Sequence, residues 1–314
     1  MSTELTPILI TKGISKWLYE TLDFYPSKIG EIFHVEDTNS RIVDHQAITT
    51  YGLPEQRTPG QNVTFQGLYP GYGQRYVVVD YAMGDFVPIE DWKDDEYGVY
   101  GRLLPKQGGA IARAFVTLRE YTAATFFKND VLGSSSTAFA DGATLCHTAH
   151  PISPTDTNTT ASNRPSTDGD LSVYNYIWAS TNLRTQKAPD GVSILRNEPA
   201  RLIIHPASRY VARQILRSDW YPGDADRNVN YIHEDNVAIT EWPYFLGGTS
   251  AQSYQNAWVV QGSTHNLYWI NRQAAAEVYT DFAVNSLSYV WVANDRFTCG
   301  ASDWRGIAGS PGKS

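Results

Sequence analysis

Residues 141–151, "DGATLCHTAHP", place a cysteine and two histidines within five positions and form the densest cluster of reactive side chains in the sequence. Cys146, His147 and His150 are side chains that bind zinc, and a thiol near a histidine can act as a nucleophile with its base. The same letters are also compatible with a turn that performs no chemistry. The choice between an enzyme and a non-enzyme therefore begins at this loop.

A metal site or a catalytic pair needs more than these three residues. A structural zinc site takes four ligands, usually as two closely spaced pairs, and no such second pair is present; His205, His233 and His265 are isolated in the sequence. Adjacent side chains such as Cys146 and His147 rarely face each other, so a distant base would be required. Pro151 restricts His150 to an extended backbone, which is typical of a turn or a strand end. We therefore interpret the cluster as structural and assign no catalytic, cofactor-binding or metal residue.

Two other oxygen-rich stretches give weaker indications of a cation site. "EDWKDDE", residues 90–96, is densely acidic but lacks the glycine-containing loop of an EF-hand. "SNRPSTDGD", residues 162–170, is polar in the manner of ordinary surface loops. We expect both to be solvated and predict no cofactor.

Composition excludes several classes of protein. The 314 residues carry a net charge of −8, and lysine and arginine form no dense run, so the chain lacks the basic stripe with which proteins grip nucleic acid. Cys146 and Cys299 are too few and too far apart for a disulfide framework. No signal peptide and no apolar stretch of membrane-spanning length is visible. The expectation is a soluble protein made in a reducing cytoplasm, with no membrane partner.

Aromatic residues are frequent, with 9 tryptophans and 20 tyrosines against 2 methionines. Aromatic side chains with a polar tip are favoured at protein interfaces, because they bury much area and tolerate partial solvation. A tyrosine-rich β protein has the same composition. Both interpretations stay open on composition alone.

The pattern along the chain predicts a mixed α+β fold. The N-terminal residues lack periodicity, and residues 41–75 are rich in glycine and proline, which favours a long hairpin. Apolar residues at helical spacing predict a long helix over 109–128. Residues 133–170 form a long polar loop that contains the opening motif, and several β-prone segments follow after residue 236.

Two further helices are expected in the second half. Val173, Ile177 and Leu183 are spaced for one face of a helix over 171–186. The segment "ARLIIHP" predicts a buried strand, and after it Val211 and Ile215 supply the face of a third helix. The terminal "GASDWRGIAGSPGKS" has the composition of a small polar tail.

In order and spacing, these motifs resemble those of a known family. "DGATLCHTAHP", "SNRPS", "APDGVSILRNEPARLIIHPASRYVARQIL", "SDWYPGDADRNVN" and "SDWRGIAGSPG" are similar to the corresponding blocks of tailed-phage major capsid proteins, and most similar to the Mu-like major head subunits. The segment 86–130, which enters the long helix, resembles the same group. The resemblance runs from about residue 75 to the C-terminus and is looser before it.

The resemblance implies the Hong Kong 97-like phage capsid fold, with an N-terminal arm and an extended hairpin, the E-loop, that reach across neighbouring subunits. The expected divisions are 1–44 for the arm, 45–76 for the E-loop, 77–167 for a peripheral domain with a spine helix at 109–128, 168–285 for the axial domain, and 286–314 for a C-terminal strand that returns to the peripheral domain. Deleting residues 52–73 should leave a soluble subunit but block stable shells.

The resemblance also implies a function and its partners. The chain is expected to be the major head protein, which self-assembles from pentamers and hexamers into an icosahedral shell around double-stranded phage DNA without sequence-specific binding. Its site would be the virion, after synthesis and assembly in the bacterial host cytoplasm. A separate scaffolding protein is expected, since the sequence begins almost directly with the arm, together with a portal and decoration proteins. The alternatives are an encapsulin-like compartment and a hydrolase that uses Cys146, His147 and His150.

Overall fold

The computed structural model confirms the mixed α+β class. It describes residues 16, 20, 27–46, 51–69, 71–133, 139, 141–222, 228–245, 256–273 and 277–313, apart from the side chains of residues 99–105. Its contacts divide the chain into two compact units. Unit 1 comprises residues 1–43, 76–122 and 268–299, and unit 2 comprises residues 44–75, 123–267 and 300–314. Most of the predicted N-terminal arm lies outside the described residues.

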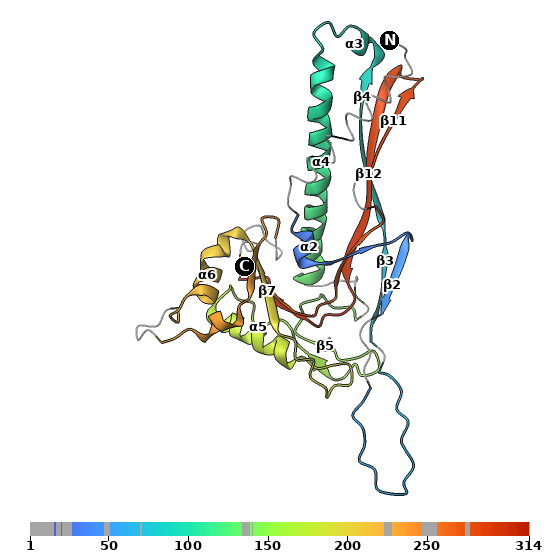
Figure 1. The fold of residues 1–314 in the computed structure, drawn as a ribbon. Coiled ribbons are helices and arrows are strands. Elements are labelled where there is room, and N and C mark those ends of the chain that lie inside the picture. The colour runs from blue at the N-terminus through green and yellow to red at the C-terminus, as the bar shows by residue number, and fades with distance from the viewer. Residues whose placement is uncertain are drawn as a thin grey trace. The chain divides into compact units, whose positions relative to one another are not determined.

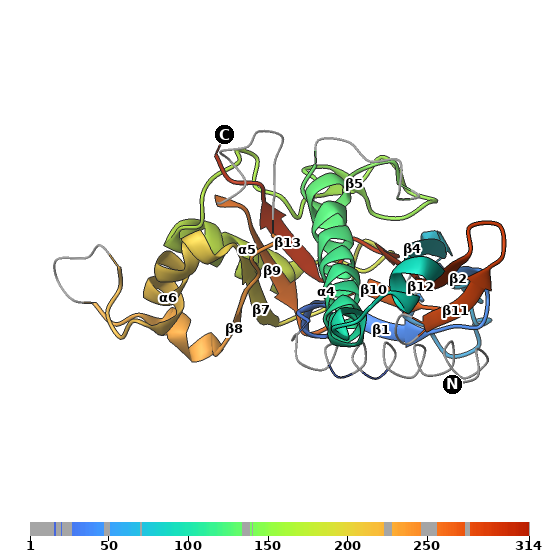
Figure 2. The ribbon, with the colours of Figure 1, turned by 90° about the horizontal axis from the view of Figure 1, so that it is seen from above.

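Unit 1 is a long helix beside a five-stranded sheet (Figures 1 and 2). The helix is α4, Val99–Phe126. The sheet has the order β1-β10-β12-β11, with β4 also paired to β12. Its strands are β1 His34–Asp37, β4 Val79–Pro88, β10 Leu267–Asn271, β11 Glu277–Ala283 and β12 Ser288–Ala301. The short helices α2, Ile29–Ile32, and α3, Ile89–Lys93, complete the unit.

The face of α4 that packs on the sheet is the one that the sequence indicated. Ile111 and Phe115 are buried in a cluster with Trp291 of β12, and Leu118 packs against the same cluster. One turn further on, Arg119 forms a bidentate ion pair with Asp295, with Nε–Oδ2 and Nη2–Oδ1 distances of 2.7 and 2.8 Å. The two hydrogen bonds of this fork offset the desolvation cost of the Asp295 carboxylate, which is fully buried.

The long helix begins earlier than the predicted 109–128, because it extends from Val99 to Phe126. Glycine costs about 1 kcal/mol relative to alanine inside a helix, so the pair Gly108–Gly109 suggested a start rather than an interior. Gly108 is buried, and packing of the helix on the sheet outweighs this penalty. A π-helical turn, η1, Phe127–Val131, then ends the helix. A Cβ at Gly133 would lie 2.1 Å from the carbonyl oxygen of Asn129, so this ending requires glycine.

Unit 2 is built on a four-stranded sheet in the order β13-β9-β7-β8. Its strands are β7 Pro199–Ile204, β8 Ala238–Glu241, β9 Trp258–Gly262 and β13 Ile307–Ser310. The helices α5, Val173–Thr185, and α6, Arg209–Arg217, share a buried core with this sheet. Short elements η2 Pro206–Ser208, η3 Tyr231–Asp235, β5 His150–Pro151 and β6 Thr160–Ala161 lie in the connections. Pro206 is the first residue of its 3-10 turn, as its fixed φ favours.

Three details of unit 2 differ from the sequence expectation. In α5 the buried face carries Tyr176, Ala179 and Leu183, whereas Ile177 is 42% exposed. In α6 Ile215 is buried as expected, but Val211 is 43% exposed. The inner positions include Tyr176 and Ala179 of α5 and Ala212 of α6, and neither alanine nor tyrosine stands out in a hydrophobic pattern. The predicted polar tail contains β13, whose four residues are all buried.

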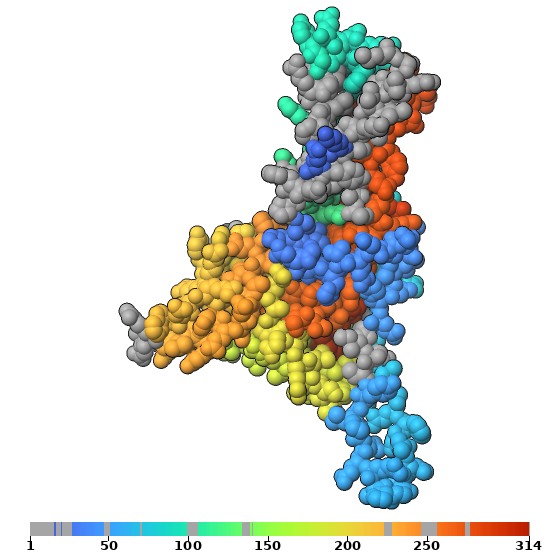
Figure 3. Space-filling view, in the orientation of Figure 1, coloured from blue at the N-terminus to red at the C-terminus, as the bar shows by residue number. Residues whose placement is uncertain are grey.

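A long hairpin connects the two strands β2, Ile42–Gln46, and β3, Gly73–Val77, which begin before and end after the range 45–76 expected for the E-loop. Between them, every residue of 51–69 is exposed except Gly52, and Figure 3 shows these atoms in light blue. The hairpin therefore buries almost nothing of its own.

Arm, E-loop, peripheral domain and axial domain describe positions within a shell. The boundaries 1–44, 45–76, 77–167, 168–285 and 286–314 therefore remain a prediction. Among the described helices, none has the length and apolar character needed to cross a membrane.

Candidate functional site

The three candidate residues of the opening motif lie in a connection of unit 2 that three segments hold in place. We call this region the junction: residues 141–151, residues 162–164 and residues 302–310. The first two segments follow the π-helical turn, and the third contains β13. The contacts of the junction described below lie within unit 2.

Cys146 is packed rather than reactive. Its side chain is fully buried, and burial raises the pKa of its thiol from 9.0 to about 12. Since the thiolate is the nucleophile and the metal ligand, a thiol with this pKa is inert at neutral pH. Its backbone N–H donates to the carbonyl oxygen of Val131 at 2.8 Å, which ties the motif to the end of the π-helical turn.

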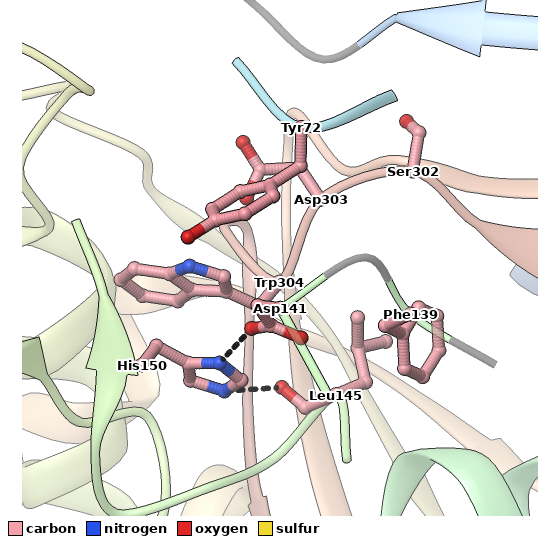
Figure 4. Close-up of a pocket in the computed structure, with 8 residues that line it drawn as sticks. All are labelled: Tyr72, Phe139, Asp141, Leu145, His150, Ser302, Asp303 and Trp304. Atoms are coloured by element: carbon pink, nitrogen blue, oxygen red, sulfur yellow. Dashed lines mark hydrogen bonds and ion pairs between the residues drawn. The ribbon is translucent and has the colours of Figure 1, made fainter. Parts of the chain in front are cut away.

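His150 uses both ring nitrogens to hold the loop closed (Figure 4). Nδ1 lies 2.7 Å from Oδ2 of Asp141, and Nε2 lies 3.2 Å from the carbonyl oxygen of Leu145. Its ring stacks on the indole of Trp304 with centroids 4.7 Å apart and planes 4° apart. The side chain is 1% exposed. With both nitrogens engaged and one face covered, His150 offers no nitrogen to a metal or a substrate.

His147 points its ring back to its own backbone. Its Nδ1 accepts a hydrogen bond from the backbone N–H of Ala149 at 3.1 Å, and the residue is half-buried. The hydrogen bonds of His147 go to Ala149 and Asn163 rather than to Cys146, so the adjacent pair does not form a thiol and base. Across the described residues, no three His, Cys, Asp or Glu side chains are grouped as ligands for a metal ion.

Asn163, from "SNRPS", connects the three segments of the junction. Its Nδ2 donates to the carbonyl oxygens of Leu145 and Ile307 at 2.7 and 3.1 Å, and its Oδ1 accepts from the backbone N–H of His147 at 2.8 Å. Its carbonyl oxygen accepts from the N–H of Gly309 at 3.1 Å. Asn163 is fully buried, so each of these bonds satisfies a group that water cannot reach.

Arg305, from "SDWRGIAGSPG", fixes the third segment. Its Nη1 lies 3.1 and 3.0 Å from the two carboxylate oxygens of Asp303, Nε donates to the carbonyl oxygen of Lys187 at 2.7 Å, and Nη2 donates to that of Ile152 at 2.6 Å. Arg305 and Asp303 are 3% and 4% exposed. The guanidinium also lies over the ring of Trp304, 4.6 Å from its centroid. The buried guanidinium of Arg305 therefore links Asp303, Lys187 and Ile152, and its role is structural.

Gly306 completes the turn before β13. Its φ of +86° lies in the left-handed region, and a Cβ there would lie 2.2 Å from the carbonyl oxygen of Thr264. Only glycine meets both conditions. The "WRG" sequence is therefore explained by a buried arginine followed by a turn that needs glycine.

A small hollow opens beside the junction (Figure 4). Its volume is about 10 Å³, room for about one water molecule, and it is lined by Tyr72, Phe139, Asp141, Leu145, His150, Ser302, Asp303 and Trp304. Both carboxylates on its wall are already engaged, Asp141 by His150 and Asp303 by Arg305. No nucleophile with an adjacent base lines it, so the hollow lacks the groups of an active site.

Residues of the other two oxygen-rich stretches also make structural contacts. In "SNRPSTDGD", Asp168 pairs with Arg164, and Arg164 Nη1 donates to the carbonyl oxygen of Gly133 at 3.0 Å. In "EDWKDDE", residues 89–93 form α3, and Trp92 packs against the core of unit 1.

The sequence directed attention to Cys146, His147 and His150, and not to Asn163, Asp303 or Arg305. A buried asparagine has no signature in a single sequence. The Asp-Trp-Arg triplet, with two charges among small residues, is the signal that could have indicated a buried ion pair.

Comparisons with known proteins agree with a structural role for these motifs. The family model described as "Phage capsid protein" matches residues 71–310, which include the whole junction. No curated protein is a significant match to the chain.

Solved structures share the fold at low sequence identity. A structure from Microbacterium phage Oxtober96 is 12% identical, with a TM-score of 0.51, and the match covers 92% of both chains. The capsid of an empty GTA particle is 11% identical, with a TM-score of 0.52, over 92% of this chain and 90% of the other. A structure from Mycobacterium phage Adephagia is 14% identical, with a TM-score of 0.50, over 92% and 91%.

These matches cover most of the chain and establish the Hong Kong 97-like fold. The family match over residues 71–310 includes the motifs of the junction. These motifs are therefore features of a capsid subunit, and their side chains stabilise its fold. The chain belongs to the phage capsid protein family.

Proposed function

We propose that this chain is the major head protein of a tailed phage, and that copies of it assemble into the icosahedral shell that encloses double-stranded DNA. The observation that carries the proposal is the family match over residues 71–310, in a chain whose fold is that of capsid subunits. The site of the protein is then the virion. The net charge of −8 suits a wall that surrounds DNA without gripping it.

The position of the exposed hairpin supports assembly from many copies. Residues 51–69 contact little of their own chain, and their apolar side chains include Tyr51, Leu53, Val63 and Phe65, at 58% to 95% exposure. Such surface is unfavourable on an isolated subunit and is normally covered in an assembly. We assign residues 45–76 to the E-loop, 1–44 to the arm, 77–167 to the peripheral domain, 168–285 to the axial domain and 286–314 to the returning strand.

The finer assignments belong to the same proposal. The order of motifs favours the Mu-like major head subunits among phage capsid proteins. The shell would be built from pentamers and hexamers, with a portal, decoration proteins and a scaffolding protein that is a separate chain. The contact with DNA would be non-specific.

Expression of the chain, followed by sedimentation and negative-stain electron microscopy, tests the proposal. We expect closed particles or capsomers, with a scaffolding protein added if the chain alone stops at capsomers. A species that stays monomeric in both conditions would contradict the proposal.

The same preparation separates the alternatives. Particles from infected or induced cells should contain nuclease-protected DNA, whereas an encapsulin-like compartment would contain cargo protein instead. A hydrolase that uses Cys146, His147 and His150 would lose its activity in a Cys146→Ala variant. The burial of that thiol argues against the hydrolase.

A further inference from the structure

The indole N–H of Trp304 is a buried donor that the contacts of the junction leave unused. Trp304 is 3% exposed, and the ring of His150 stacks on its face with centroids 4.7 Å apart. The guanidinium of Arg305 also lies over the ring, 4.6 Å from its centroid. Both contacts involve a face of the indole, and among the described residues no group accepts a hydrogen bond from Nε1. A buried N–H normally bonds to a protein group or to an ordered water molecule.

Another buried tryptophan of unit 2 pairs this group within the chain. Nε1 of Trp258 donates to the carbonyl oxygen of Gly169 at 2.9 Å. Nε1 of Trp291, in unit 1, is also without a partner among the described residues. Trp304 differs from Trp291 because it lines the hollow beside the junction, and this hollow offers space for a partner from outside the chain.

The size of the hollow limits what it holds. Its volume is about 10 Å³, which is close to the space that one water molecule needs. In Figure 4 the indole nitrogen lies on the edge of the ring that is turned toward the hydroxyl end of Tyr72, and both residues line the hollow. A molecule larger than water does not fit in this space.

The hydroxyl of Tyr72 supplies a second polar group on the wall. Burial raises the pKa of this hydroxyl, and the negative charges of Asp141 and Asp303 raise it further, against the opposing effect of Arg305. The phenol therefore keeps its proton at neutral pH and can donate a hydrogen bond into the hollow. These charge effects also place Tyr72 close to both carboxylates.

The carboxylates of Asp141 and Asp303 are the acceptors on the wall. Asp141 is bonded to His150 through Oδ2 and accepts from the backbone N–H of Ala143 through Oδ1 at 3.1 Å. Asp303 accepts from the backbone N–H and from Nη1 of Arg305. An ionised carboxylate has about four acceptor positions, so both side chains keep capacity for a further donor.

These groups select a neutral ligand that both accepts and donates hydrogen bonds. The N–H of Trp304 needs an acceptor and repels a metal cation, which has no lone pair to offer. The carboxylates of Asp141 and Asp303 repel an anion. A water molecule is neutral, accepts and donates hydrogen bonds, and has the size of the hollow.

We propose that the hollow binds one water molecule, which accepts hydrogen bonds from Nε1 of Trp304 and the hydroxyl of Tyr72 and donates to the carboxylates of Asp141 and Asp303. Buried waters with several such bonds act as part of a protein's structure. Tyr72 directly precedes β3, so this water joins the root of the exposed hairpin to the junction. The site goes beyond the proposed function, because it lies within one subunit and does not require a shell.

A structure of the full chain at a resolution that shows ordered water tests the site directly, from a crystal of the subunit or from shells by cryo-electron microscopy. We expect a solvent peak within about 3.2 Å of Nε1 of Trp304 and of at least one of the two carboxylates. In Trp304→Phe the peak should be lost. Ser302→Ala is the matched control, because Ser302 lines the same hollow away from the indole in Figure 4, and it should keep the peak.

Unfolding of dissociated subunits gives a second readout. Tyr72→Phe should lower the urea midpoint of the unaltered chain, and should lower that of Trp304→Phe by less than half as much, because both side chains act through the same water molecule. Equal shifts in the two backgrounds would overturn the shared water.

The unaltered chain decides the matter even if Trp304→Phe does not fold. The proposal is overturned if the hollow shows no solvent peak, or if Nε1 of Trp304 bonds directly to the hydroxyl of Tyr72. It is also overturned by a peak with the short contacts of a metal cation and none to Nε1, or by a peak that persists in Trp304→Phe. None of these results bears on whether the chain forms shells.

Discussion

The side-chain amide of Asn163 donates a hydrogen bond to the carbonyl oxygen of Ile307 across 3.1 Å, and so joins two segments that are 144 positions apart in the sequence. The same amide reaches the carbonyl oxygen of Leu145 in the opening motif. One buried side chain therefore holds the loop after the long helix against the C-terminal strand. The stability of unit 2 should depend on it.

Replacing Asn163 with alanine should lower the free energy of unfolding by about 3 kcal/mol, because the N–H of His147 loses its acceptor and the carbonyl oxygens of Leu145 and Ile307 each lose one donor inside the protein. Urea unfolding of dissociated subunits measures this. Asn158→Ala, at an exposed position of the same connection, is the matched control and should change stability by less than about 0.5 kcal/mol. Equal effects at both positions would refute the role given to Asn163.

Arg305→Lys should lower the free energy of unfolding although the positive charge is kept. The lysine ammonium cannot span the carboxylate of Asp303 and the carbonyl oxygens of Lys187 and Ile152 as the planar fork does. We expect a loss of about 3 kcal/mol in the free energy of unfolding. Arg213→Lys, where the arginine is 53% exposed and 3.8 Å from Glu241, should be nearly neutral. A neutral Arg305→Lys would show that the buried fork is not needed.

The thiol of Cys146 should make the subunit less stable in alkali. Burial raises its pKa from 9.0 to about 12 in the folded state, so between these values the unfolded chain releases a proton that the folded chain keeps. Stability then falls as pH rises above 9, by up to about 1.4 kcal/mol per pH unit. In Cys146→Ala this contribution is absent, so the difference in stability between the two proteins should shrink from pH 9 to 11. A difference that stays constant over that range would contradict the assignment.

The register of the hairpin can be tested by disulfide formation in a Cys299→Ser background. Cysteines at positions 55 and 64 replace two side chains that are hydrogen-bonded across the hairpin, and should form an intrachain disulfide readily. Cysteines at 55 and 62 lie on the same face but out of register. Mass spectrometry after mild oxidation should find the first disulfide at least ten times more abundant. Preference for the second would place the tip in another register.

The helices and strands with a strong hydrophobic pattern could be predicted from the sequence. The β-prone segments after residue 236 and the helical spacing of apolar residues over 109–128 matched strands and the long helix that form. The start of α4 was missed, because the two glycines at 108 and 109 carry a local penalty that only tertiary packing offsets. The inner faces of α5 and α6 were partly missed, because alanine and tyrosine contrast weakly with exposed positions.

At the junction, only part of the structure could be predicted from the sequence. The motif 141–151 could be located from the sequence, and its structural interpretation agrees with the burial of Cys146 and His150. Its partners could not be found, since Asn163 and Arg305 are polar residues whose burial depends on contacts with distant parts of the chain. Strand β13 was missed for a related reason. Its small residues give no β signal, yet it pairs with β9 over four positions.

The central claim is that this chain is a shell subunit, and cryo-electron microscopy of the expressed protein tests it most directly. The prediction is closed icosahedral particles in which the hairpin of residues 51–69 lies on a neighbouring subunit, with the side chain of Phe65 buried in that contact. A protein that remains monomeric, even with its scaffolding protein present, would contradict the claim.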